Sequence, residues 1–128
     1  MARNPQQSLG QQGEALAAQW LTKNLKFKII DRNWRSGSFV ELDLVAIDKS
    51  RPERVLVAVE VKTRESQARG RGVESITPKK LYTLKRSFLF FKKAHPKTPD
   101  LMRIDAVDVL LEDPSHPDIR YYRDITSC

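Results

Sequence analysis

The sequence predicts a single α/β domain in which helices pack on one mixed sheet. The chain has 128 residues, of which 40% are hydrophobic, and this is enough to bury one core. Two segments show the periodicity of amphipathic helices, and five shorter runs show the composition of strands. No repeat or long internal linker divides the chain. We therefore expect one domain over residues 8–128, preceded by a flexible N-terminus over residues 1–7.

The predicted elements follow one another in the order α-β-β-β-α-β-β. Ser8 is a suitable N-cap for the first helix, and Thr77 followed by Pro78 is a typical start for the second. The dipeptide His95-Pro96 ends the second helix. The helices are expected over residues 8–24 and 77–94, and the strands over residues 26–33, 39–48, 54–63, 101–111 and 119–125. Residues 64–76 contain three Arg and two Gly without periodicity, which predicts a mobile basic loop.

Charge and composition predict which class of partner the protein binds and in which cellular compartment it is found. The chain has 23 Lys and Arg against 16 Asp and Glu, a formal charge of +7, and this favours a polyanionic partner such as nucleic acid. A soluble protein that is merely basic is the alternative. No apolar run reaches the roughly 20 residues that cross a bilayer, so no membrane association is expected. The N-terminal segment lacks the apolar stretch of a signal peptide, and Cys128 is the single cysteine, which together predict a cytoplasmic protein without an intrachain disulfide.

The second and third strands are expected to form an antiparallel hairpin, because the polar segment DKSRPER separates them. If paired residue numbers sum to about 103, Ile47 lies opposite Leu56 and Val45 lies opposite Ala58. Apolar residues then meet apolar residues, which supports this register. The same register places two acids opposite residues of the run VAVEVKTR.

These two pairs are Asp43 with Glu60, and Glu41 with Lys62. Directly opposed Cβ atoms lie about 4.5–5.5 Å apart, and two carboxylates this close raise one another's pKa unless a cation lies between them. A hard divalent cation such as Mg²⁺ takes oxygen ligands of this kind, and Lys62 beside it could polarise a phosphate or a water molecule. The alternative is that the strand ends reach solvent and that Glu41 and Lys62 form an ordinary cross-strand ion pair.

The two helices carry further charges at unusual positions. Glu14 lies on the same face as the apolar stripe of the first helix, where an unpartnered charge is costly, although the helix dipole also favours an acid near the helix start. Lys79 and Lys80 begin the second helix, where that dipole disfavours cations, so contact with an anion would explain them, although solvated lysines are the commoner case.

Three arginines directly follow or lie close after the third strand and could contact a phosphate backbone. They are Arg64, Arg69 and Arg71. The segment around them lacks interleaved aromatic residues, so we expect contacts there to phosphates rather than to bases.

Five segments in order resemble the successive motifs of the YraN family of bacterial proteins. They are GEALAAQWL, RNWR, VELDLVAID, VAVEVKTR and RIDAVDV, and the resemblance spans residues 10 to about 112. That family is placed in the PD-(D/E)xK nuclease superfamily, so the resemblance implies a restriction-endonuclease-like fold with an α-β-β-β-α-β core. The layout of a helical Glu, an Asp and a Glu-x-Lys is also similar to that of archaeal Holliday-junction resolvases.

The resemblance implies a role for each matching residue. Asp43 and Glu60 would bind a divalent metal, Mg or Mn, with Glu14 as a supplementary acidic ligand. Lys62 would orient the nucleophilic water and stabilise charge at phosphorus. Four further residues match motif positions whose role is less clear, namely Glu41, Arg64, Arg103 and Asp105.

The sequence departs from the family pattern at two positions near these acids. Val40 stands where the family usually has Gly, which could alter the bend that enters the site. Leu42 replaces the Pro of the superfamily's name, a frequent variation that leaves the direction of Asp43 unchanged.

The function that these features predict is a metal-dependent endonuclease that hydrolyses DNA phosphodiesters, including those of branched structures. One alternative is a nucleic-acid-binding protein that keeps the nuclease fold without cleavage. It would depend on Arg64, Arg69, Arg71, Lys79 and Lys80. A protein–protein adaptor with a basic surface is a third reading. A homodimer would suit an enzyme that cuts both strands of a symmetric junction, but no segment of the sequence marks an interface.

Overall fold

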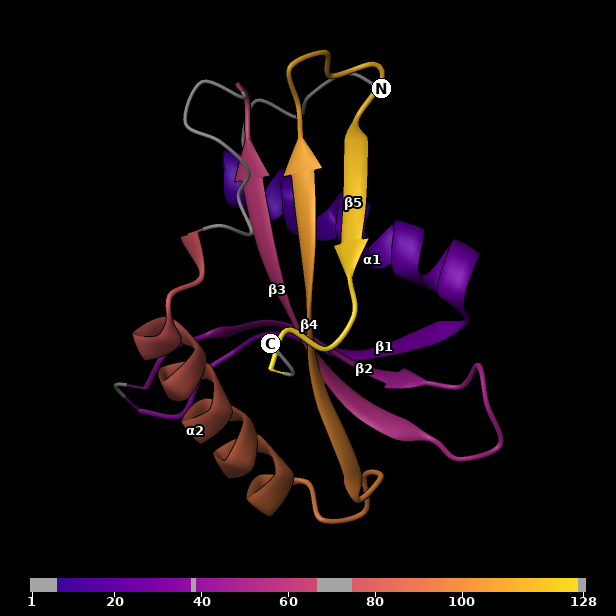
Figure 1. Ribbon diagram of the computed structural model, residues 1–128, viewed down its shortest axis with the longest axis vertical. Coiled ribbons are helices and arrows are strands. Elements are labelled where there is room, and N and C mark those ends of the chain that lie inside the picture. The colour runs from indigo at the N-terminus through magenta and orange to yellow at the C-terminus, as the bar shows by residue number, and fades with distance from the viewer. Residues whose placement is uncertain (1–6, 38, 67–74, 127–128) are drawn as a thin grey trace.

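The computed structural model describes residues 7–37, 39–66 and 75–126, and it confirms the predicted order of elements (Figure 1). The elements are α1 (Leu9–Leu25), β1 (Phe27–Trp34), β2 (Leu42–Asp48), β3 (Val55–Arg64), α2 (Pro78–Ala94), β4 (Leu101–Leu110) and β5 (Asp118–Tyr122). The predictions for the N-terminal segment, the basic loop and the C-terminal thiol fall wholly or partly on residues 1–6, 67–74 and 127–128, which lie outside the described residues, as do Arg69 and Arg71.

Two strand bounds differ from the prediction by more than one residue. β2 begins at Leu42 rather than at Phe39, because Phe39 stacks on Phe90 of α2, with ring centroids 4.6 Å apart. The carbonyl of Val40 accepts a hydrogen bond of 2.7 Å from Ser87 Oγ, also on α2. The chain therefore contacts the helix before it joins the sheet. β5 ends at Tyr122, and Asp124, two residues later, has a φ of 53°, which an extended strand does not accommodate.

The five strands form one mixed sheet in the order β1-β2-β3-β4-β5. β3 and β4 are parallel and α2 connects them, whereas the other neighbouring pairs are antiparallel. The predicted register of the β2–β3 hairpin is confirmed, since Val45 pairs with Ala58 and Ile47 pairs with Leu56. The ladder between these strands extends to the pair Leu44 and Val59, next to Asp43 and Glu60.

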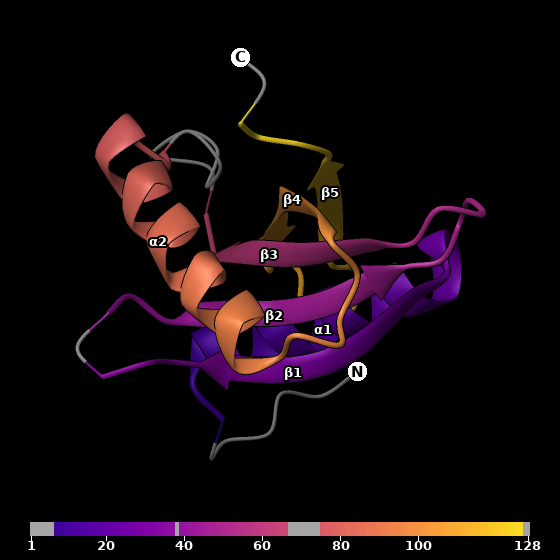
Figure 2. The ribbon, with the colours of Figure 1, turned by 90° about the horizontal axis from the view of Figure 1, so that it is seen from below.

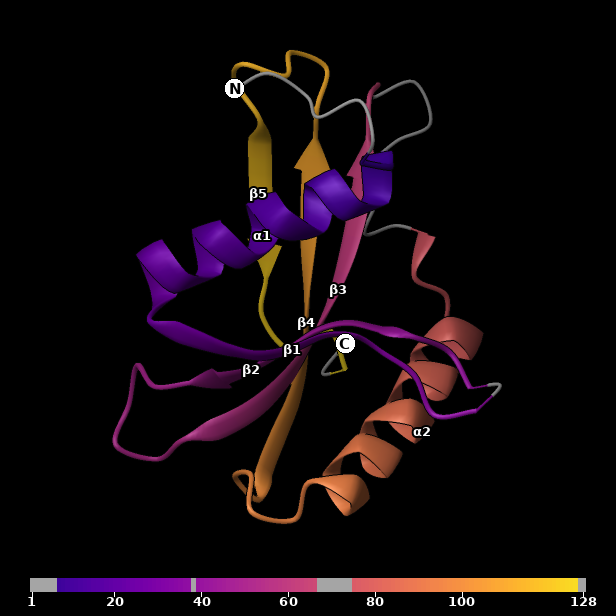
Figure 3. The same ribbon diagram turned by 180° about the vertical axis from the view of Figure 1, so that it is seen from behind.

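The two helices cover opposite faces of the sheet (Figures 2 and 3). Ala17 and Leu21 of α1 belong to a buried cluster that includes Val57 of β3. Phe88 of α2 belongs to a second buried cluster with Leu56, also of β3. Alternate side chains of one strand therefore fill two cores. Within the described residues, neither helix is both long and apolar enough to cross a membrane.

Gly13 lets α1 approach β3 closely. A Cβ atom added at Gly13 would lie 2.7 Å from Thr63 Cβ and closer still to Thr63 Oγ1, whereas one added at Gly10 would meet nothing within 4 Å. Thr63 is held in the sheet by its pairing with Val109. The absent side chain at Gly13 therefore sets the distance between α1, which carries Glu14, and the strand that carries Glu60.

We expect Gly13→Ala to lower the free energy of unfolding by about 1–3 kcal/mol, because the new methyl group forces α1 away from β3. Gly10→Ala is the matched control in the same helix. It should raise stability by up to about 1 kcal/mol, because Ala favours helix and this position has free space. Urea denaturation of both variants checks the pair, and equal effects of the two substitutions would contradict the close-approach argument.

Candidate functional site

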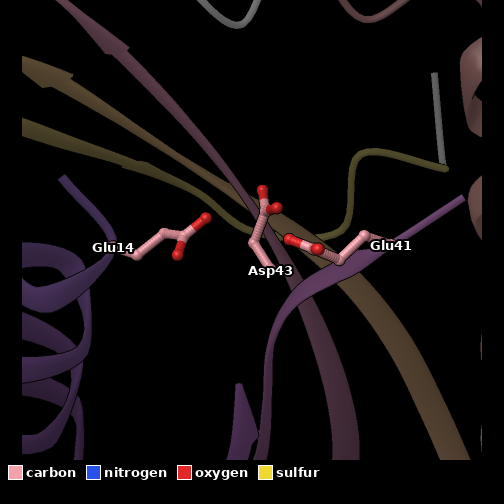
Figure 4. A group of neighbouring side chains, drawn as sticks. All are labelled: Glu14, Glu41 and Asp43. Carbon is pink, nitrogen blue, oxygen red and sulfur yellow. The ribbon is translucent and has the colours of Figure 1, made fainter. Parts of the chain in front are cut away.

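The carboxylates of Glu14, Glu41 and Asp43 lie close together, one carried by α1 and two by the chain at the start of β2 (Figure 4). One carboxylate oxygen from each of Glu14, Glu41 and Asp43 lies within 4.8 Å of the others. Glu14 comes from the second turn of α1, Glu41 from the residue before β2, and Asp43 from β2 itself. The helical Glu14 and the two acids at the start of β2 thus form one half-buried group, which we call the acidic cluster.

Asn33 holds two of these carboxylates. Its side-chain nitrogen donates hydrogen bonds of 2.8 Å to Glu14 Oε1 and to Glu41 Oε1. Asn33 lies in β1 with a φ of 52°, a left-handed conformation that Asn tolerates better than most residues. Sequence reasoning placed Asn33 in the RNWR motif but gave it no role. The only sequence signal for this role was the presence of an Asn in a predicted strand.

Asp43 is a strongly perturbed member of the acidic cluster. Burial raises its pKa to about 7, and the nearby charge of Glu60 adds to this increase. The backbone N–H of Val61 opposes the shift, because it donates a 2.8 Å hydrogen bond to Asp43 Oδ2. Burial likewise raises the pKa of Glu14, while the hydrogen bond from Asn33 lowers it. The cluster therefore concentrates more negative charge than its described neighbours compensate.

Glu60 lies beside the acidic cluster and faces two lysines. Its side chain is 5% exposed, and its Oε1 is 3.5 Å from Lys62 Nζ and 3.9 Å from Lys80 Nζ. The other oxygen, Oε2, has no hydrogen-bond partner among the described residues. The charge of Glu60 raises the pKa of both Asp43 and Glu14, so Glu60 acts on the cluster electrostatically. Lys80 thus faces this site from the first turn of α2, whereas Lys79 is exposed on the surface.

The structure does not form the ordinary cross-strand pair between Glu41 and Lys62 that the sequence left as an alternative. Among the described residues, Glu41 instead contacts Asn33 and, at 3.9 Å, Arg35. Lys62 pairs with Glu60 on its own strand. The β2 chain has already left the sheet at Glu41, so this residue is displaced from the position opposite Lys62 that regular pairing would give it.

Arg64 lies at the end of β3 and forms an ion pair with Asp108 on the neighbouring parallel strand β4. Its Nη2 is 3.2 Å from Asp108 Oδ2 on β4, and the two side chains are 19% and 2% exposed. Arg64 Nε and Nη1 are buried without a hydrogen-bond partner among the described residues. The contact with Asp108 therefore uses only part of the hydrogen-bonding capacity of the guanidinium.

Arg103 and Asp105 form a separate buried network rather than part of the acidic cluster. Arg103 donates to Asp105 Oδ1 at 2.8 Å and to Asp48 Oδ2 at 2.9 Å, and Asp48 ends β2 at the opposite end from Asp43. Asp105 is completely buried and also accepts a 2.6 Å hydrogen bond from Tyr121. These contacts tie β2, β4 and β5 together and assign the two motif residues to stability.

The fold and the site together define an α/β protein with an acidic cluster beside two lysines. The chain belongs to the Uncharacterised protein family UPF0102, whose profile matches residues 13–109. This is the YraN family that the five motifs predict, so that prediction is confirmed.

Curated relatives match over nearly the whole chain. The UPF0102 protein Lxx14785 of Leifsonia xyli is 36% identical over 113 residues, which cover 88% of this chain and 91% of the relative. A UPF0102 protein of Syntrophomonas wolfei is 39% identical over 105 residues, covering 82% and 86% of the two chains. The UPF0102 protein RSal33209_1090 of Renibacterium salmoninarum is 39% identical over 115 residues, covering 90% and 92%.

The raised pKa of Asp43 predicts a pH dependence of stability. The folded protein retains a proton on Asp43 up to about pH 7, whereas the unfolded chain loses it near the ordinary value of 3.8. Its contribution to the free energy of unfolding is therefore complete below that value and is lost as the pH rises to about 7. Asp43→Asn should flatten the profile between about pH 4 and pH 8 and be more stable than the wild type at the upper end.

Urea denaturation across this range checks the expectation, with Glu53→Gln, an exposed acid in the β2–β3 loop, as the control that follows the wild type. A wild-type profile parallel to that of Asp43→Asn would contradict it. If the acidic cluster binds a divalent cation, Mg²⁺ or Mn²⁺ will stabilise the wild type more than Asp43→Asn at the upper pH, because only the wild type keeps this carboxylate.

The buried network around Asp105 makes a second, independent prediction. Asp105→Ala leaves Arg103 buried without its main partner, so we expect a loss of about 3–5 kcal/mol in the free energy of unfolding. The double variant Arg103→Met/Asp105→Leu removes both charges and should recover a large part of that loss. Urea denaturation measures both variants, and a double variant less stable than the single one would show that the pair itself is required.

Proposed function

We propose that this protein is a metal-dependent nuclease that hydrolyses phosphodiester bonds of DNA. The observation that supports the proposal most directly is the gathering of Glu14, Glu41 and Asp43 within 4.8 Å, next to a buried Glu60 and two lysines. Hydrolysis of a phosphodiester needs concentrated acids for a cation and fixed positive charge for the phosphate. Both kinds of group are present here.

The donor set fits a hard divalent cation. All the candidate ligands are carboxylate oxygens, which Mg²⁺ and Mn²⁺ prefer. Burial raises the pKa of Asp43, and a cation would relieve the carboxylate repulsion that adds to this increase. Asp43, Glu14 and Glu41 would hold the cation, with Glu60 adjacent. When bound, such a cation supplies Lewis acidity toward the phosphate and acidifies a water molecule.

The remaining residues of the site place positive charge for a phosphate. Lys62 is 30% exposed and is held by Glu60 on a rigid strand, so its ammonium group can orient a water molecule or contact a phosphate oxygen. Lys80 approaches the same carboxylate from α2. Arg64, two residues after Lys62 along β3, is paired with Asp108, and its other two donor nitrogens are buried.

One observation favours a second candidate, a nucleic-acid-binding protein that does not cleave. Lys62 and Lys80 already offset the charge of Glu60 through the contacts at 3.5 Å and 3.9 Å. A site in which lysines take the place of part of the metal's charge would still bind phosphate. It would lack the capacity to activate water.

The proposal predicts cleavage of labelled DNA that requires Mg²⁺ or Mn²⁺ and stops in EDTA. Single-stranded, duplex, flapped and four-way-junction substrates are compared side by side. Asp43→Asn and Glu60→Gln should each reduce the cleavage rate by about 100-fold or more, since each removes a charge on which the metal or Lys62 depends. Glu53→Gln is the control and should cleave as the wild type does.

Stability is measured in parallel, so that a loss of activity is separated from a loss of fold. Binding of the same DNA without cleavage, equal in the wild type and Asp43→Asn, would overturn the nuclease proposal for those substrates. It would favour the non-cleaving candidate instead.

A further inference from the structure

The outward face of α2 carries a cluster of aromatic and basic side chains, which we call the α2 platform. Phe39 and Phe90 are in contact with each other, and Arg86 lies over the rings of Phe39 and Tyr82. The rings of Phe39 and Phe90 lie 4.6 Å apart, and the Arg86 guanidinium lies 5.5 Å from the centre of Phe39 and 5.9 Å from that of Tyr82. The residues of the platform are Phe39, Tyr82, Lys85, Arg86, Leu89, Phe90 and Lys93.

The platform is exposed although its members include large apolar side chains. Tyr82 is 60% exposed, Leu89 62% and Phe90 36%. The core is filled by other residues of α2, such as Phe88 and Phe91. An open groove of about 550 Å³ follows the exposed face. Tyr82, Leu89 and part of Phe90 are therefore accessible to a ligand.

The charge of α2 restricts what that ligand can be. The helix carries basic residues and no acidic residue over Pro78–Ala94. A second copy of the chain packed on the same face by a two-fold axis would bring like charges together, which is unfavourable. A polyanion with flat apolar groups is complementary to both the charge and the rings.

The platform is continuous with the acidic cluster. Phe39 lies two residues before Glu41, and Ser87 of α2 binds the carbonyl of the intervening Val40. At the start of the same helix, Lys80 contacts Glu60. The connection between β1 and β2 can be followed beside α2 in Figures 1 and 3.

We propose that the α2 platform binds an unpaired single strand of DNA by stacking its bases on Tyr82 and its neighbouring rings. This inference rests on the proposed function and names its substrate class, which is DNA with an unpaired segment beside the bond that is cut. Aromatic stacking contributes about 1–3 kcal/mol per base and needs a free base face, which the interior of a duplex does not offer. Arg86 and the flanking lysines would contact the phosphates.

The test measures binding in EDTA, where no metal-dependent cleavage takes place. Fluorescence anisotropy compares a labelled thymidine oligonucleotide of about 15 nucleotides with a duplex of the same length. Tyr82→Ala should weaken binding of the single strand by about 5- to 150-fold, the equivalent of one lost stacking contact, and change duplex binding much less. Tyr82→Phe keeps the ring and should bind as the wild type does.

Leu101→Ala is the matched control, because it removes an apolar side chain that is 50% exposed and lies outside the platform. It should leave single-strand binding unchanged. A 2-aminopurine base in the oligonucleotide gives a second readout, since its fluorescence should fall when it stacks on the wild type and recover in Tyr82→Ala.

Two outcomes would overturn the platform proposal. In one, Tyr82→Ala binds the single strand as tightly as the wild type. In the other, single-strand and duplex binding weaken equally, which would indicate phosphate contacts alone. If Leu89→Ala instead altered the molar mass in solution while Tyr82→Ala left DNA binding unchanged, the face would be a contact between copies of this chain.

These results are separable from those of the nuclease test. Single-strand binding that depends on Tyr82, combined with no metal-dependent cleavage, would retain the platform and overturn the nuclease proposal. Cleavage that requires Asp43, combined with binding indifferent to Tyr82, would do the reverse.

Discussion

Repulsion among the carboxylates of Glu14, Glu41 and Asp43 is the constraint that the surrounding structure has to accommodate. Three acids within 4.8 Å, partly withdrawn from water, are unfavourable unless donors and cations surround them. Asn33 donates to two of them, and the backbone N–H of Val61 donates to the third. These hydrogen-bond donors hold the carboxylates in place but do not neutralise their negative charge. Burial and the remaining repulsion therefore keep the pKa of Asp43 raised. Under the proposed function, a bound cation would lower it.

The two charged networks of the sheet differ in how completely their hydrogen-bond partners satisfy them. Asp105 is fully buried, but Arg103, Tyr121 and a backbone N–H satisfy it, so its charge is compensated within the fold. Glu60 is nearly as buried, yet one of its oxygens has no hydrogen-bond partner among the described residues. Compensation is typical of a structural network, and incomplete compensation is typical of a site that receives a ligand. Motif membership alone could not separate these two cases.

The sequence predicted the order of elements, both helix starts and the β2–β3 register, because these depend on local periodicity, on capping residues and on a two-residue repeat. For the same reason, the sequence predicted that Asp43 and Glu60 lie close together. It did not predict that Glu41 would join the acidic cluster and separate from Lys62, because that depends on where the chain leaves the sheet. Nor did it give Asn33 a role, since a left-handed residue within a strand is a tertiary feature that no local pattern specifies.

The bend between Phe39 and Leu42 links the acidic cluster to the α2 platform. Because the chain leaves the sheet here, Phe39 reaches α2 while Glu41 reaches Asn33, on opposite sides of Val40. A β2 extended to Phe39 by regular pairing would place Phe39 and Glu41 on the same face of the sheet, with Glu41 opposite Lys62. The irregular segment therefore allows an arrangement of side chains that a longer regular strand would not. It directs one side chain to the carboxylates and another to the exposed rings, so that a strand stacked on α2 would lie next to the acidic cluster.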